Sequence, residues 1–342
     1  MRRSTRFGLV VVIVLLAGFG AYAAYWRIVA GRIKDGLADW RESAQTHKID
    51  ASWRGLRVAG FPFAFRVEIK NASVRDRAWS PAPELRLARL AGTARPWDFA
   101  DWRLAAPDGL AAELAPAGGR PPLKLAAKSG DGTVAIGRDG AARLWLRLQD
   151  VSAEAVGKAP IASAEAWVTL PAKSAVKDAD PSLGLAVDLH RMRVAAPPAS
   201  FGHTIDELAL GVTLKGAVPD GPLPRAAAAW RDAGGTIEVD NLRLQWGGLG
   251  ISANGTLALD GKLQPMAAFS GGIEGFGAIL NALVAADQMT PEQASLVEIA
   301  LSYLARPGPD GKPQITAPFT IQDGKVFIGP ARLGRLPPIV WE

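Results

Sequence analysis

The chain has 342 residues, of which 49% are hydrophobic, and it contains no cysteine. The lack of cysteine excludes disulfides, thiolate catalysis and cysteine-ligated zinc or iron–sulfur sites. The formal net charge is +6, but six of the 39 basic residues lie within residues 1–34, which hold no acidic residue, so the remaining 33 equal the 33 acidic residues. The basic excess therefore suits anionic lipid head groups, and we expect no nucleic-acid partner.

The segment Phe7–Trp26 is an uncharged stretch of 20 residues. A helix of that length spans roughly 30 Å, the hydrocarbon thickness of a bilayer. Tyr22 and Tyr25 lie near its end, as aromatic residues do at a membrane interface. We therefore expect a single-span protein of a bacterial inner membrane, with a cytoplasmic tail (1–6), a transmembrane signal-anchor (7–26), a helical stalk (27–48) and a periplasmic β-rich domain (49–342).

A cleaved signal peptide is the alternative interpretation of this stretch. Arg2 and Arg3 would belong to its basic region, and Ala21-Tyr22-Ala23 would be its cleavage site. We favour the anchor because the apolar run exceeds the usual 7–15 residues, and because a helical pattern continues through Ile33 and Leu37. Either interpretation sends the remainder across the membrane.

Most of the remaining chain alternates apolar and polar residues, which is typical of half-buried strands. Strand after strand with one apolar face predicts a mainly β fold, a long curved antiparallel sheet forming a groove or open half-barrel. Such a face can pack against a second layer as a core, or line an open groove for acyl chains, and the pattern allows both. The candidate groove residues are Leu144, Leu146, Leu148, Leu185, Val187, Leu189, Leu208, Leu210 and Val212.

A helical hairpin near residues 276–305 interrupts the strands. Thr290 offers an N-cap, Pro291 the first helical position and Gln293 the third position of a capping box. We expect the sheet to pack against this pair, with a core near the helices and the groove toward residues 144–214.

The sequence contains few catalytic or metal-binding patterns. Ser174 and Lys177 form the single S-x-x-K, in a stretch typical of a solvated loop. His190 and His203 are candidates for a metal pair, but they lie near strand ends without a matching array of metal ligands. The carboxylates of Asp98 and Asp101 could serve acid–base chemistry, but a turn explains them equally well. The 11 tryptophans are scattered, which favours packing over sugar binding. We expect no catalytic residue, no cofactor, no metal and no enzymatic activity.

Three segments carry a resemblance to a known family: Gly60-Phe61-Pro62-Phe63-Ala64-Phe65-Arg66, residues 242–259, and the ending 321–338. Together with the helical pair, they make the chain similar to an uncharacterised family of Gram-negative bacteria, domain-of-unknown-function family 2125. This resemblance implies neither an activity nor catalytic residues. More loosely, the repeated strands look like the periplasmic grooves of AsmA-type envelope proteins, which are implicated in lipid movement.

The membrane-proximal motif Gly60, Phe61, Pro62 and Phe63 can also be interpreted from its residues alone. Glycine and proline favour a bend, and the two phenylalanines either anchor it in the core or touch lipid. We favour the core. The leading hypothesis is an inner-membrane-anchored periplasmic protein that binds lipid, or a lipid-bearing envelope component, along an apolar β-groove. The alternative is a non-catalytic interaction scaffold in envelope assembly, with other envelope proteins as partners.

Overall fold

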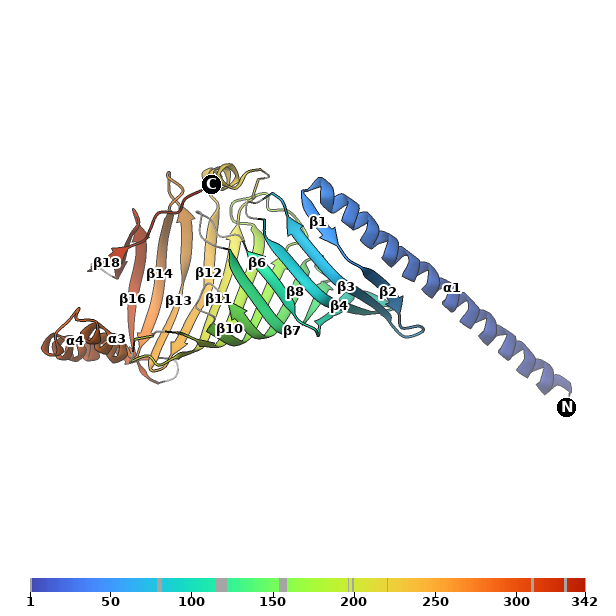
Figure 1. Ribbon diagram of the computed structural model, residues 1–342, viewed down its shortest axis with the longest axis horizontal. Coiled ribbons are helices and arrows are strands. Elements are labelled where there is room, and N and C mark those ends of the chain that lie inside the picture. The colour runs from blue at the N-terminus through green and yellow to red at the C-terminus, as the bar shows by residue number, and fades with distance from the viewer. Residues whose placement is uncertain are drawn as a thin grey trace.

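The computed structural model describes residues 2–78, 82–114, 122–153, 159–195, 197–198, 200–219, 221–308, 311–328 and 331–341. One antiparallel sheet dominates this part of the chain (Figure 1). The helices are α1 (Arg2–Thr46), α2 (Leu223–Asp232), α3 (Phe276–Ala285) and α4 (Pro291–Leu304). The first strands are β1 (Ile49–Ser52), β2 (Gly55–Ala59), β3 (Phe65–Asp76), β4 (Glu84–Arg95), β5 (Asp98–Ala106), β6 (Leu110–Leu114), β7 (Leu123–Ile136), β8 (Ala142–Ala153) and β9 (Ala159–Leu170). They are followed by β10 (Pro181–Arg193), β11 (Thr204–Lys215), β12 (Thr236–Trp246), β13 (Leu249–Leu259), β14 (Pro265–Glu274), β15 (Arg306–Pro307), β16 (Pro313–Gln322), β17 (Lys325–Ile328) and β18 (Ala331–Arg335).

The sheet is a meander in which nearly every strand pairs with its neighbours in the sequence. Strands β1 and β2 both pair with β3, and β5 and β6 both lie between β4 and β7. From β7 to β14 each strand pairs with the next, and β16, β17 and β18 continue the sheet. All of these pairs are antiparallel, which confirms the predicted mainly β fold with one long antiparallel sheet.

Helix α1 runs without a break through the segments predicted as anchor and stalk. Within it, Val12–Thr46 is long and apolar enough to cross a membrane. Figure 1 shows α1 along the β1–β2 end of the sheet, with its N-terminal part projecting beyond the strands. Ala30 and Ala44 are buried, so the second half of the helix packs against the domain.

The nine candidate groove residues lie on one face of the sheet, here called the inner face. Leu146 of β8 pairs with Ala166 of β9. Ala166 pairs with Val187, and Val187 with Leu210 of β11. Because directly opposed residues share a face, these four form one row across the sheet. Two parallel rows contain Leu144, Val168, Leu185 and Val212, and Leu148, Ala164, Leu189 and Leu208.

An irregular line crosses the sheet, here called the crease. Asn71, Asp150 and Arg191 have positive φ values of 50°, 49° and 52° although they lie within strands β3, β8 and β10. Asp150 and Arg191 lie on the two sides of Ala162 of β9. A left-handed residue departs from the extended backbone of a strand, although the pairing register continues unchanged past each of these three. The crease comprises Asn71, the break between β5 and β6 at residues 107–109, Asp150, Arg191 and the register shift between Ile205 and Glu207.

The C-terminal helices lie at the end of the sheet far from α1 (Figure 1). The predicted capping box is present: Gln293 N donates to Thr290 Oγ1, and Thr290 N donates to Gln293 Oε1. However, α4 exposes Leu296, Ile299 and Tyr303 at 68%, 56% and 81%. The predicted core beside these helices is present but small: Leu280 of α3, Ala294 of α4 and Leu249 of β13 are buried, whereas much of the apolar stripe of α4 is exposed.

Helix α2, which the sequence analysis does not predict, closes the turn between β11 and β12. Its Trp230 is buried, and the indole Nε1 donates to the carbonyl of Lys215 at 2.7 Å.

Candidate functional site

The inner face holds an apolar cavity of about 390 Å³. The candidate residues Leu144, Leu146 and Leu148 of β8 line one side of it. The leucines of β4, β5 and β6 line the other side, so the sheet curves around the cavity. These leucines are Leu85, Leu87, Leu90, Leu104 and Leu110. The sheet therefore encloses a space bordered mainly by aliphatic side chains.

A second cavity of about 280 Å³ continues the first toward the helix. Leu90 and Leu104 border both cavities. Ile33 and Leu37 of α1 form the opposite wall of the second one. The apolar inner face is thus continuous from β8 to the helix that carries the predicted membrane anchor.

The other candidates extend the inner face away from α1. Leu185 of β10 and Leu210 of β11 are 37% and 38% exposed. Helix α1 adjoins β1 and β2, α3 adjoins β13 and α4 adjoins β16, while α2 closes the β11–β12 turn, where Trp230 donates to the carbonyl of Lys215. The candidates of β10 and β11 therefore form an open apolar wall. These are Leu185, Val187, Leu189, Leu208, Leu210 and Val212.

Packing is tight at the crease. Ala127, Val151 and Ile161 are buried on adjoining strands, each with at most 7% of its surface exposed. Partly buried residues on both sides of the crease pack against them: Leu110, Leu148, Ala164, Leu189 and Met192. The sequence analysis did not predict this cluster. The sequence does carry a signal for this cluster. The alternation of apolar and polar residues changes phase between Leu148 and Val151, which share a face although they are three residues apart.

The opposite, outer face carries paired charges. Arg147 Nη2 lies 2.9 Å from Glu165 Oε1, and Trp145 Nε1 donates to Glu165 Oε2 at 3.1 Å. Arg243 and Glu207 form a similar pair at 3.2 Å. Since ion pairs and indole groups tolerate water, this face is the solvent-facing side of the sheet.

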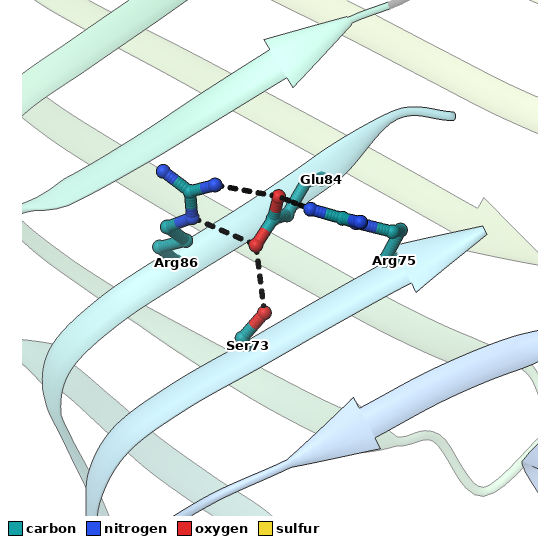
Figure 2. Close-up of polar contacts among 4 residues, drawn as sticks. All are labelled: Ser73, Arg75, Glu84 and Arg86. Atoms are coloured by element: carbon teal, nitrogen blue, oxygen red, sulfur yellow. Dashed lines mark hydrogen bonds and ion pairs between the residues drawn. The ribbon is translucent and has the colours of Figure 1, made fainter. Parts of the chain in front are cut away.

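The most strongly paired carboxylate lies on the outer face of the β3–β4 hairpin. Arg86 Nε donates to Glu84 Oε1 and Arg86 Nη2 to Oε2, both at 2.7 Å, as Figure 2 shows. Arg75 Nη2 also donates to Glu84, at 2.5 Å, and Ser73 Oγ donates at 3.0 Å. Hydrogen bonds from Arg86 and Arg75 lower the pKa of Glu84 to about 2. This cluster binds the two strands together, and the sequence analysis did not identify it.

The membrane-proximal motif forms the turn between β2 and β3. Gly60 has φ 105°, and a Cβ there would lie 2.6 Å from the carbonyl oxygen of Ala64, so the turn requires glycine. Phe65, just after the motif, is fully buried and stacks on Trp26 of α1 at 5.0 Å between ring centroids. Phe61 is 40% exposed and Phe63 is 76% exposed. The prediction that both motif phenylalanines anchor the core is therefore wrong for Phe63.

The catalytic and metal candidates are not assembled into a site. Ser174 and Lys177 are exposed in the loop before β10. His190 of β10 pairs with Glu207 of β11. His203 comes just before Thr204, which pairs with Arg193. The two imidazoles are therefore several positions apart along the β10–β11 pair. No group of three or more metal-ligating side chains occurs within the described ranges.

Asp98 and Asp101 do share a cavity, of about 480 Å³, at the end of the sheet nearest α1. Arg95 and Arg103 border the same cavity, so the carboxylates lie in a mixed polar setting beside the Phe63 turn.

These features define a mainly β protein with an N-terminal apolar helix and a sheet that is apolar on one face. The chain belongs to the bacterial family described as "Uncharacterized protein conserved in bacteria (DUF2125)", whose model matches residues 26–337. The predicted family resemblance is thereby confirmed. Searches of curated proteins and of solved structures give no match to this chain.

Proposed function

We propose that this protein is membrane-anchored and non-enzymatic, and that it binds lipid acyl chains, or the acyl part of a lipid-bearing envelope component, along its inner face. The observation that carries the proposal is the unbroken apolar surface, from the cavity beside α1 to the exposed wall at Leu185 and Leu210. An apolar surface of this extent in water is unfavourable unless something covers it. Acyl chains match its aliphatic lining and its near lack of polar groups.

The anchor is supported by the contacts of α1 with the sheet. Tyr22 Oη donates to the carbonyl of Pro62, and the ring of Phe19 meets that of Phe61 at 5.7 Å. Cleavage after Ala23 would remove both contacts. We therefore propose that Phe7–Trp26 is retained and spans the inner membrane, with the basic residues Arg2, Arg3 and Arg6 in the cytoplasm and the sheet in the periplasm.

Membrane fractionation and a reporter test this topology. The protein should stay in the membrane after carbonate washing, and a periplasm-dependent reporter fused after Glu342 should be active. A soluble form starting at Ala24 would contradict the anchor.

Photocrosslinking tests lipid binding. A benzophenone amino acid at Leu185 should crosslink to phospholipid in cells, whereas the same group at Trp167 should not. Trp167 is a matched control because it is 36% exposed on the outer face of the adjacent strand. Mass spectrometry of the purified full chain should find co-purified phospholipid, and Leu185→Asp with Leu210→Asp should reduce it. Equal crosslinking at both positions, or no lipid in the wild type, would contradict the proposal.

An interaction scaffold is the second candidate, and α4 favours it. Its exposed residues Leu296, Ile299 and Tyr303 lie at helical spacing on an apolar surface suited to a protein partner. A benzophenone amino acid at Tyr303 distinguishes the two functions: a crosslinked protein band, with no lipid at Leu185, would favour the scaffold.

A further inference from the structure

Two turns at the end of the sheet nearest α1 expose large aromatic side chains. One is the β2–β3 turn, with Phe61 and Phe63, and the other is the β4–β5 turn, with Trp97. Phe63 is 76% and Trp97 is 70% exposed. We call these two turns, residues 60–64 and 95–98, the tip. Aromatic rings exposed to this extent mark a surface that meets an apolar partner.

The tip is attached to the last part of the uncharged stretch of α1. Phe61 packs against Phe19 and, at 5.8 Å between ring centroids, against Trp26. Tyr25 Oη donates to the carbonyl of Pro96 at 3.0 Å, and Trp26 Nε1 donates to that of Ala64 at 3.2 Å. The tip therefore lies at the level of residues 19–26 of the helix.

This attachment determines the depth of the tip if α1 spans a bilayer. Residues 19–26 occupy about 10 Å along the helix axis. Without them, Phe7–Gly18 would span only about 18 Å, which is too short for a hydrocarbon core of roughly 30 Å. Residues 19–26 must therefore enter the bilayer, and the tip beside them must enter it too.

The backbone of the tip suits this location. In lipid, each N–H and C=O group needs a partner from the protein. Side chains of α1 donate to the carbonyls of Pro62, Ala64 and Pro96, and the two prolines have no N–H. The amides of Phe63 and Ala64 donate to the carbonyl of Gly60 at 3.2 and 3.0 Å.

Basic side chains surround the tip on the adjoining strands. Arg57, Arg66 and Arg103 are exposed there, and Arg95 is exposed within the tip itself. Asp98 of the tip and Asp101 border the same cavity as Arg95 and Arg103. Guanidinium groups at this level suit the phosphates of lipid head groups.

We propose that the tip is inserted into the periplasmic leaflet of the membrane that α1 spans, with Phe63 and Trp97 among the lipids and the flanking arginines at the phosphates. This inference rests on the anchoring part of the proposed function and not on lipid binding along the inner face. It places the apolar cavities, which begin beside the tip, next to the lipid source.

Site-directed spin labelling tests the insertion, and the absence of native cysteine makes a single introduced cysteine unique. Nitroxide labels at Phe63→Cys and Trp97→Cys in the full chain would be compared in liposomes of phosphatidylethanolamine and phosphatidylglycerol. Val14→Cys, inside the apolar stretch, is the lipid control. Tyr303→Cys and Val176→Cys, exposed at 81% and 87%, are the water controls. Unchanged melting by circular dichroism shows that each labelled chain is folded.

The labels at Phe63 and Trp97 should resemble the label at Val14. Their ratio of oxygen to nickel-chelate accessibility should be several-fold above that of the labels at Tyr303 and Val176. Water-like accessibility at both tip positions, with Val14 in lipid, would overturn the insertion. Water-like accessibility at Val14 would overturn it as well, because α1 would not span the bilayer. Crosslinking at Leu185 is independent of these outcomes, so failure of the tip and failure of the lipid groove are distinguishable.

Discussion

Val151 and Leu185 occupy the inner face of the same sheet, yet their surroundings differ. Val151, at the crease, is 4% exposed, whereas Leu185, on the open wall, is 37% exposed. Both residues belong to runs that alternate apolar and polar side chains. The difference coincides with the left-handed residues Asp150 and Arg191, which interrupt the extended strands beside the buried cluster, while the regular strands beyond them stay extended. One apolar face therefore provides both a core and an exposed surface.

The largest expected effect on stability comes from introducing a charge at Val151, and the matched variant introduces the same charge at Leu185. Val151→Asp buries an unpaired carboxylate and should cost several kcal/mol, a large part of a domain's stability of about 5–15 kcal/mol. Leu185→Asp leaves the new carboxylate accessible to water and should change the melting temperature little. Thermal unfolding of the purified full chain measures both, and equal destabilisation would show that the open wall is a packed core.

A smaller effect should follow from the backbone of the crease. Asp150 has φ 49°, a conformation that a β-branched residue adopts only at a cost of about 1–2 kcal/mol. Asp150→Val should therefore lower stability by about that amount, and Asp150→Gly should not. Gln149→Val, at the adjacent exposed position, is the matched control. Denaturant unfolding measures all three, and an unaffected Asp150→Val would mean that the crease does not depend on the left-handed conformation of this residue.

The stability that the outer face contributes should depend on pH, whereas the contribution of the inner face should not. Because the pKa of Glu84 is lowered to about 2, its ion pairs stabilise the fold above the unfolded pKa near 4.5, and this contribution is lost as pH falls toward 2. We expect about 1 kcal/mol, since the side chains of Arg75 and Arg86 are half exposed or more.

The Glu84→Gln variant tests this pH dependence. It should melt below the wild type at pH 7, and the difference should shrink to nothing near pH 2. Glu68→Gln, whose partner Lys70 is 4.0 Å away, is the control and should show a smaller difference. A Glu84→Gln difference that persists at pH 2 would mean that the loss is one of packing.

The smallest effect is expected at the positions considered for catalysis. Ser174→Ala and His203→Ala alter exposed side chains and should shift stability by less than about 0.5 kcal/mol. They should also leave lipid co-purification unchanged, and a chelator should not change the melting temperature. A stoichiometric bound metal, or a loss of cellular function in Ser174→Ala, would contradict a non-enzymatic role.

Which residues share a face could be predicted from local alternation alone. Side chains of a strand point alternately to opposite faces, so the alternation at residues 144–148, 183–189 and 208–214 was sufficient to group the nine inner-face candidates. The capping box at Thr290 was also predictable, because its two hydrogen bonds form between residues three apart. The apolar helix was predictable as well, because it depends on an uninterrupted run of uncharged residues.

Which of those residues are covered, by contrast, depends on the three-dimensional arrangement of the sheet and the helices. Burial depends on the path of the strands, and Arg191, unlike Asn71, is not a residue type that signals a left-handed backbone conformation. Phe63 and Phe65 have the same side chain and lie two residues apart, but α1 covers one and leaves the other exposed. Glu84 lies two residues from Arg86 on its own strand, yet two of its three partners, Arg75 and Ser73, come from β3. Such contacts join segments distant in the sequence, where local periodicity carries no information about them.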